Sequence, residues 1–121
     1  MTHWKALQVE RRDRSDPRIS IWRLSGTLTS GKEGYAFLDD LRAQLRDRPG
    51  AILINLEGVE HVTSAGVGIL AAAYTSAANA QTRLMLAAIP RQALTVLSIL
   101  NLLSIIEHDE TEEGGLARLS S

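Results

Sequence analysis

The chain has 121 residues, of which 45% are apolar and 22% are charged, and it contains no cysteine. This composition is typical of a folded domain, so we expect a single domain over residues 1–121, and it excludes disulfides and thiolate metal sites. The formal net charge of −1 and the absence of a Lys/Arg block argue against nucleic acid as a partner, because binding to the phosphate backbone needs a basic surface.

We expect a cytoplasmic protein without direct membrane insertion. The N-terminal residues lack the apolar core of a signal peptide. The segment from Leu94 to Ile106 is strongly apolar, but it is too short and too interrupted to span a bilayer.

The chain begins with a predicted hairpin. Apolar and polar residues alternate over residues 6–11 and again over residues 19–24, which predicts two strands. The polar residues 12–17, which end in a proline, predict the turn that joins them.

A helix and a buried strand follow the hairpin. Ser30 and Glu33 have the spacing of a capping box, and the helix that they would begin has one apolar face and stops at Pro49. Residues 51–56 form a nearly continuous apolar run. Such a run is typical of a central strand with helices on both faces of the sheet.

The second half of the chain alternates helices with strands. Apolar spacing predicts a helix from Ala65 to about Ala80 and a buried strand over residues 84–89. A short helix is then expected from Arg91 toward Asn101, a good C-terminal cap.

The last predicted elements are a short strand at Ile105 and Ile106 and a final helix. Asp109 and Glu112 have the spacing of a capping box for this helix, which carries Leu116 on its apolar face. The element order predicts an α/β sandwich with a four- to five-stranded mixed sheet and about four helices. After the hairpin the strands should be largely parallel and joined by right-handed crossovers.

The most distinctive segment joins the central strand to the alanine-rich helix and has the sequence Val59-Glu60-His61-Val62-Thr63-Ser64-Ala65-Gly66-Val67-Gly68. Two hydroxyl residues stand at the helix start, and the simplest interpretation is that one of them caps the helix. The small residues around them also allow another backbone to approach closely. Together, an exposed hydroxyl and small neighbours describe a phosphorylatable contact site.

Phosphate on Ser64 would lie beside the positive end of the helix dipole, a position that favours anions. The helix should therefore stay folded when it is modified. Any regulatory effect would come from charge and bulk placed in the contact surface of a partner, where a dianion is costly to desolvate.

This segment, with the element order and the length, resembles the STAS domain of bacterial anti-sigma-factor antagonists. The family pattern is an apolar strand followed by Asp-Ser-Ser/Thr-Gly-Leu-Gly at a helix start, and residues 53–68 supply Leu-Ile-Asn-Leu-Glu-Gly-Val-Glu-His-Val-Thr-Ser-Ala-Gly-Val-Gly. Residues 22–28, Trp-Arg-Leu-Ser-Gly-Thr-Leu, are similar to the end of the family's second strand. Residues 96–102, Val-Leu-Ser-Ile-Leu-Asn-Leu, are similar to its third helix.

The resemblance implies a non-enzymatic binding module without cofactors. Its expected partner is an anti-sigma factor with a GHKL-type serine kinase domain, captured when the module is unphosphorylated and released after phosphorylation, and a PP2C-type phosphatase resets it. Ser64 falls on the phosphoacceptor position, with Thr63 as a secondary acceptor. The expected partner-binding residues are Thr29, Val62, Thr63, Ser64, Ala65, Gly66, Val67 and Gly68.

Three positions depart from the family pattern. Thr63 replaces the Asp that usually precedes the phosphoacceptor, Ala65 replaces the second hydroxyl residue, and Thr29 replaces an Asp often found after the second strand. An alternative is therefore a docking subunit that works without phosphorylation, in a transporter such as a lipid-transport ATPase or in a stress-signalling complex.

A third hypothesis is a small P-loop NTPase. The segment that begins at Gly26 and ends at Lys32 matches G-x-x-x-x-G-K and lies between a predicted strand and a predicted helix. The next residue, however, is Glu33, where a Mg²⁺-binding Ser or Thr is needed, and a carboxylate there would repel phosphates.

The remaining polar and aromatic residues suggest no further chemistry. His3, His61 and His108 lie far apart in the sequence and lack a metal-binding spacing, so we expect no metal site. Trp22 and Tyr74 follow apolar periodicities and should pack in the core.

Overall fold

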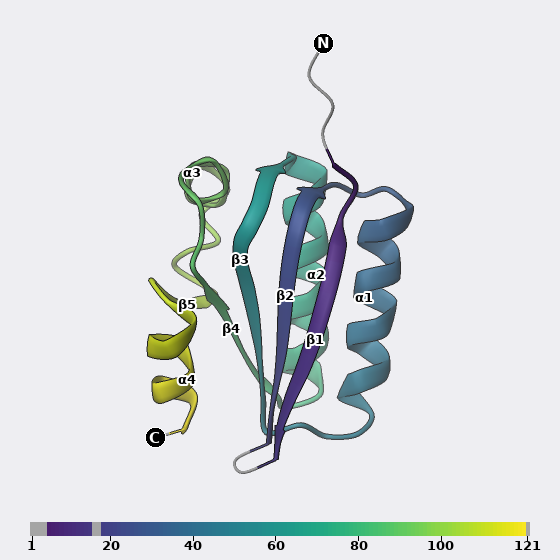
Figure 1. Cartoon of the computed structure of the whole chain (residues 1–121), viewed down its shortest axis with the longest axis vertical. Helices are drawn as coiled ribbons and strands as arrows, with labels where there is room; N and C mark the ends of the chain where they lie inside the picture. Colours follow the sequence, from purple (N-terminus) through teal and green to yellow (C-terminus); the bar gives the residue numbers. More distant parts are fainter. Residues whose placement is uncertain (1–4, 16–17, 121) are drawn as a thin grey trace.

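The computed structural model of the chain describes residues 5–15 and 18–120. In chain order its elements are β1 (Gln8–Ser15), β2 (Arg18–Leu28), α1 (Lys32–Leu45), β3 (Ala51–Val62), α2 (Ser64–Asn79), β4 (Arg83–Ala87), α3 (Arg91–Ile99), β5 (Glu107–Asp109) and α4 (Glu112–Ser120). The five strands form one sheet in the order β1-β2-β3-β4-β5 (Figure 1). β1 is antiparallel to β2 and every other neighbouring pair is parallel, which confirms the predicted mixed sheet.

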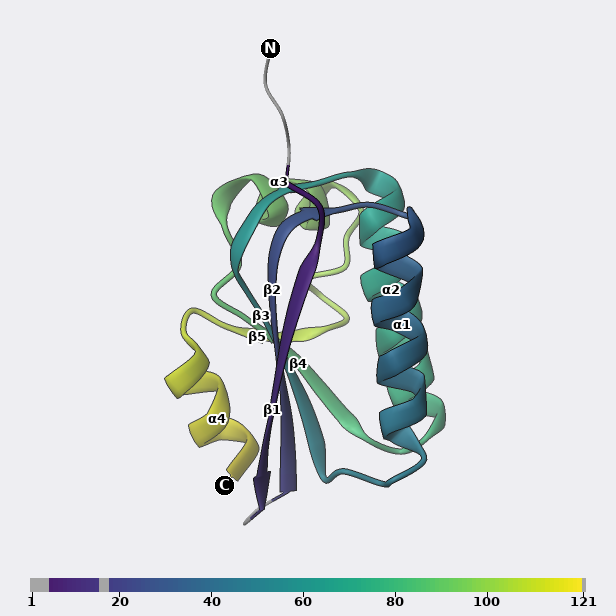
Figure 2. The same ribbon diagram turned by 45° about the vertical axis from the view of Figure 1, so that its right-hand side comes forward.

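Helices cover both faces of the sheet (Figure 2). α1 and α2 lie on one face and α4 lies on the other. The larger core is on the α1 and α2 side, where Trp22 of β2 packs edge-on against Phe37 of α1 with ring centroids 5.6 Å apart. The smaller core lies under α4 and contains Ile19, Ile21, Ala51, Leu53, Met85 and Ala87, with Leu116 and Leu119 packed against it. Trp22 is a core residue as predicted, and Tyr74 is half-buried against the larger core.

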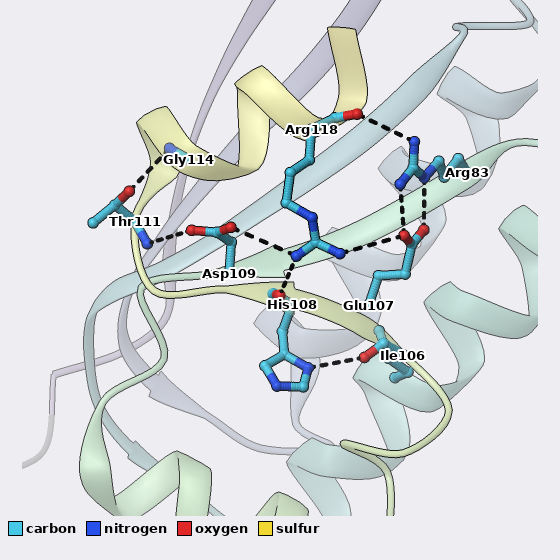
Figure 3. A network of polar contacts seen from close by, with 8 residues as sticks. All are labelled: Arg83, Ile106, Glu107, His108, Asp109, Thr111, Gly114 and Arg118. Carbon is cyan, nitrogen blue, oxygen red and sulfur yellow. Dashed lines mark hydrogen bonds and ion pairs between the residues drawn. The ribbon is translucent and has the colours of Figure 1, made fainter. Parts of the chain in front are cut away.

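Polar contacts fasten α4 to the edge of the sheet (Figure 3). Arg118 of α4 reaches β5, where it donates to the carbonyl oxygen of His108 at 2.8 Å and pairs with Asp109 at 3.5 Å. Glu107 of β5 pairs in turn with Arg83 of β4 at 2.6 Å. The guanidinium of Arg83 holds the pKa of Glu107 below its usual value. Polar contacts therefore join the last helix to the last strand, while Leu116 and Leu119 of the helix pack on the smaller core.

The cap of α4 is Thr111, and the predicted capping box of Asp109 and Glu112 is wrong. The hydroxyl of Thr111 accepts the N–H of Gly114 at 2.9 Å, and the carboxylate of Asp109 accepts the N–H of Thr111 at 3.2 Å. Glu112 does not turn back to the cap because Arg23 of β2 binds its carboxylate in a bidentate manner, with both contacts at 2.8 Å.

Glu112 also accepts a hydrogen bond from Asn55 of β3 at 3.0 Å. The hydrogen bonds and charge of Arg23 outweigh the cost of burial and lower the pKa of Glu112. This network places the N-terminus of α4 over the middle of the sheet.

The predicted start of α1 is also different in detail. Its cap is Gly31 and has no side-chain hydrogen bond, so the capping box expected from Ser30 and Glu33 does not form. The hydroxyl of Thr29 accepts the N–H of Gly31 at 3.0 Å, which satisfies a donor just ahead of the helix.

The hairpin has a longer first strand than its sequence predicts. The strand expected over residues 6–11 is instead Gln8–Ser15, paired along its whole length with β2. The predicted turn over residues 12–17 is therefore wrong up to Ser15, and residues 16–17 lie outside the described part of the chain. The charged side chains of an edge strand can face solvent while its main chain pairs, so polarity alone does not mark a turn.

Two other strand ends differ from their predictions. β4 ends at Ala87 because Ala88 adopts a positive φ of 54°, which takes the chain out of the sheet. The final strand is Glu107–Asp109 and not Ile105–Ile106, because β5 pairs with β4 from Glu107 onward while Ile106 is buried just before it.

Asn101 confirms the predicted end of α3. It adopts a left-handed φ of 58°, and the next N–H, that of Leu102, donates back to the carbonyl of Leu97 at 3.0 Å. This is the Schellman arrangement, in which an asparagine can replace the usual glycine.

Candidate functional site

The candidate site is the turn from β3 into α2 at the carboxyl end of the sheet (Figure 1). β3 runs to Val62, beyond the predicted end at residue 56, so Glu60 and His61 belong to the strand and not to a turn. The extension is possible because β2 continues beside β3 as far as the pair of Leu28 with Val62. The turn is therefore short and directly anchored to the sheet.

Thr63 is the N-cap of α2. Its side chain accepts the N–H of Gly66 at 2.9 Å, and its own N–H donates to the carbonyl of Leu28 at 3.1 Å. The cap interpretation of the two hydroxyls therefore holds for Thr63. Its hydroxyl is occupied in the fold, whereas Ser64 is left at the first helical position.

Ser64 is exposed, and its hydroxyl makes no hydrogen bond to any residue in the described part of the chain. The first turn of α2 carries no acidic side chain. A phosphate on this hydroxyl would therefore meet the positive end of a helix without a fixed negative charge in the same turn. Because the cap next to it is already satisfied, modification would not remove a contact that holds the helix.

The two glycines of α2 have different surroundings. At Gly66, an added β-carbon would lie 2.1 Å from the carbonyl oxygen of Leu28 and 3.2 Å from the nitrogen of Thr29. Gly66 therefore allows α2 to approach the chain's own β2, and this corrects the idea that it is kept small for a partner. A β-carbon at Gly68 would meet no atom within 4 Å, and this position is exposed.

The predicted partner surface is divided by burial. Ser64, Ala65 and Gly68 are exposed and Thr63 is half-buried, as is Thr29, whose backbone lies beside the first turn of α2. Val62 and Val67 are each only 1% exposed. Their side chains pack in the larger core and are not available as an apolar patch for a partner.

Gln92 is a site residue that the sequence does not reveal. It lies near the start of α3, and its side-chain amide binds both main-chain groups of Val62: the oxygen accepts the Val62 N–H at 2.8 Å and the nitrogen donates to the Val62 carbonyl at 3.0 Å. β4 pairs with β3 only as far as Asn55, so Gln92 takes the role of a neighbouring strand at the end of β3. A polar residue in the first turn of a helix carries no sequence signal for such a contact.

The segment that resembled a P-loop does not have the form of one. Gly26 is inside β2, with a positive φ of 89°, and a β-carbon there would collide with the carbonyl of Ala6. β2 continues to Leu28, so only a short connection remains before α1 begins at Lys32. A phosphate-binding loop needs several successive free N–H groups around the anion, whereas Gly26, Thr27 and Leu28 are engaged in strand pairing with β3.

Within the described ranges 5–15 and 18–120, no three His, Asp or Glu side chains are arranged to hold a metal ion. His61 is half-buried in β3 and His108 lies in β5, while His3 lies outside the described residues. None of the helices in the same ranges is both long and apolar enough to cross a membrane.

Three comparisons with known proteins place this geometry in a wider context. A family model of the STAS domain matches residues 10–114. No curated protein matches the sequence. Among solved structures, an anti-sigma factor antagonist from Mycobacterium paratuberculosis is 21% identical with a TM-score of 0.82, and the alignment covers 96% of each chain.

Two further solved structures are also similar. The anti-sigma factor antagonist SpoIIAA in its unphosphorylated form is 19% identical, with a TM-score of 0.76 over 94% of this chain and 96% of that one. A sulfate transporter family protein from Wolinella succinogenes is 15% identical, with a TM-score of 0.70 over 84% of both chains. At these identities the likeness shows a shared fold.

Proposed function

We propose that this chain, which belongs to the STAS domain family, is an anti-sigma-factor antagonist that captures a serine-kinase anti-sigma factor and is released when Ser64 is phosphorylated. The observation that carries the proposal is the division of work between two adjacent hydroxyls. The hydroxyl of Thr63 forms the capping hydrogen bond of α2. Ser64 is exposed beside it, and its side chain is not needed to hold the helix.

The unphosphorylated surface is suited to close contact with another protein. Ser64, Ala65 and Gly68 are small residues on one exposed part of α2. The backbone beneath them is held by Leu28 on one side and by Gln92 on the other. A surface that is already ordered loses little conformational entropy when a partner docks on it.

Phosphorylation would weaken binding of the partner without unfolding the helix. The added phosphate carries close to two negative charges and sits at a helix N-terminus, where the dipole stabilises it in the free protein. In the complex the same dianion would have to lose its water against the partner, and that cost is large unless the partner supplies cations. The free state is therefore favoured after modification.

Transfer of labelled phosphate tests the proposal. The protein is incubated with labelled ATP, with and without the serine-kinase anti-sigma factor of the same organism. We expect label on the chain only when the kinase is present, loss of that label in Ser64→Ala, and its retention in Ala65→Ser, which keeps Ser64. Label that persists at full stoichiometry in Ser64→Ala would move the switch to another residue and refute the assignment.

A second candidate is a docking subunit that works without phosphorylation, in a transporter or stress-signalling complex. It is favoured by Thr63 at the position where the family pattern has Asp, and by the fold shared with the sulfate transporter family protein. In that case the same surface would bind its partner and the kinase would transfer no label.

A further inference from the structure

β1 is an open edge of the sheet. One side of the strand pairs with β2 over its whole length, and no other strand of the described chain pairs with its outer side. Figure 2 shows β1 in front of the sheet, between α1 and α4, with neither helix over it. All of its residues are exposed. The strand therefore offers a row of main-chain donors and acceptors to another strand.

The edge is densely charged, with the run Glu10-Arg11-Arg12-Asp13-Arg14. Charges on an edge strand normally keep unrelated strands away. The order of positive and negative side chains along β1 determines which strand can still pair with it. Opposite charges that face each other across an antiparallel pair attract, and like charges repel.

The register with β2 shows which face each charge occupies. Arg11 lies opposite Trp22, and its guanidinium stands 5.4 Å from the centre of that ring, so Arg11 is on the α1 face together with Asp13. Glu10 pairs with Arg23, which binds α4, so the even-numbered charges are on the α4 face. The two faces can therefore be matched separately.

A second copy of β1 fits this pattern when the two strands run antiparallel about Arg12. On the α4 face, Glu10 then lies opposite Arg14 of the second copy. On the α1 face, Arg11 lies opposite Asp13 of the second copy. Each of these pairs occurs twice by symmetry, and the only like-charge pair is Arg12 with itself. An interface of this kind uses the same patch on both subunits and closes on itself.

Neighbouring symmetric registers lack this match. A two-fold axis at Arg11 sets Glu10 opposite Arg12 on the α4 face, but on the α1 face it opposes Arg11 to itself and leaves Asp13 opposite Val9. An axis at Asp13 opposes Asp13 to itself and sets Arg12 against Arg14. A slip by a single residue is excluded, since it would pair side chains that point to opposite faces. Only the register centred on Arg12 brings opposite charges together on both faces.

We propose that the chain forms a symmetric dimer in which two β1 strands pair antiparallel about Arg12, so that the two sheets join into one. The proposal is independent of Ser64, because β1 contributes nothing to the turn from β3 into α2. A dimer would carry two copies of that turn, and a partner with two matching sites would then bind with increased avidity.

Charge reversal at one cross-strand pair tests the dimer. The full chain is studied by sedimentation velocity over a range of concentrations as the wild type, as Glu10→Arg, as Arg14→Glu, and as an equimolar mixture of the two variants. In each variant alone, two attractive pairs become two repulsive ones. In the mixture, position 10 of one variant faces position 14 of the other with opposite charge at both places.

We expect a concentration-dependent dimer for the wild type, dissociation constants raised about tenfold in each variant, which corresponds to about 1.4 kcal/mol, and recovery of the dimer in the mixture. Asp39→Arg and Lys32→Glu make the same changes of net charge on α1 and should leave the equilibrium unchanged. Glu10→Arg also removes the contact of Glu10 with Arg23 within one chain, and mixing does not restore that contact. Recovery of the dimer in the mixture would therefore show that the weakening arises from the pairs between chains.

Three results would overturn the proposal. One is a wild type that stays monomeric throughout the concentration range. Another is a dimer that both variants form as tightly as the wild type does. The third is a mixture that dimerises no better than the separate variants, since this would place the interface elsewhere on the surface.

Discussion

Replacing the two glycines of α2 by alanine tests the anchoring of the site to the sheet. A β-carbon at Gly66 would stand 2.1 Å from the oxygen and 2.6 Å from the carbon of the Leu28 carbonyl. Both are backbone atoms at the end of β2 and cannot rotate away as the end of a flexible side chain can. A β-carbon at Gly68, one residue beyond Val67 on the same helix, meets nothing within 4 Å.

The expected free energies follow from these distances. In Gly66→Ala the first turn of α2 has to move away from Leu28, and such overpacking costs about 3 kcal/mol, of which the better helix propensity of alanine returns about 1 kcal/mol. Gly68→Ala has only the gain in propensity and should stabilise the fold by about 1 kcal/mol. We therefore expect Gly66→Ala to be less stable than Gly68→Ala by about 3 kcal/mol.

Equilibrium unfolding in urea measures this difference. The two variants have the same composition, so a shift of the midpoint at unchanged slope reports stability alone. The displaced first turn of Gly66→Ala also moves Ser64, and we expect weaker binding of the partner by this variant even where it is fully folded. Equal midpoints for the two variants would refute the close approach of α2 to β2.

Three more predictions concern the two supports of the site and the ion pair that holds the start of α4. Thr63→Ala should destabilise the fold by about 1 kcal/mol in thermal or urea unfolding because the cap of α2 is lost, and Thr63→Ser should restore most of it. Gln92→Ala leaves both main-chain groups of Val62 without their partner and should cost about 2 kcal/mol, with faster amide exchange at Val62 than in the wild type; unchanged exchange would contradict its role. Arg23 keeps the pKa of Glu112 below its ordinary value. The pair therefore stabilises the fold at any pH above the ordinary pKa, and this contribution is lost as the pH falls through the lowered pKa. Glu112→Gln should accordingly cost about 1 kcal/mol near neutral pH, a figure that already takes account of the partial exposure of the pair. In acid the difference in stability from the wild type should vanish. Urea unfolding at several pH values would measure this.

The sequence predicts the layers of this fold because they depend on apolar periodicity. The continuous apolar run that begins at Ala51 and the spaced apolar residues of α2 have few alternatives to burial in a sheet and against it. The end of α3 is also local, since Asn101 supplies the left-handed residue of its own cap. Signals that act within a few residues are visible in the sequence.

The sequence-based predictions are wrong where residues distant in the chain bind the side chain or main chain that a local pattern would use. Glu112 has the spacing of a capping box with Asp109, yet Arg23, which is 89 positions away in the chain, binds its carboxylate instead. The polar run after Arg11 resembles a turn, but pairing with β2 keeps it extended through Ser15. Local patterns cannot show which long-range partner wins.

The candidate site shows the same division. Its position at the start of α2 and the two adjacent hydroxyls are present in the sequence, and the structure adds that Thr63 is the one used as the cap. The burial of Val62 and Val67 and the contact of Gln92 depend on packing between β3, α2 and α3. Those features had no local signal.

The most direct test of the proposed switch is the affinity of the anti-sigma factor for variants of Ser64. Isothermal titration calorimetry would compare the wild type, Ser64→Ala and Ser64→Asp. We predict that Ser64→Ala binds as the wild type does and that Ser64→Asp binds at least about thirtyfold more weakly, or about 2 kcal/mol, because a carboxylate is desolvated in the interface. Binding of Ser64→Asp as tight as that of the wild type would contradict the proposal.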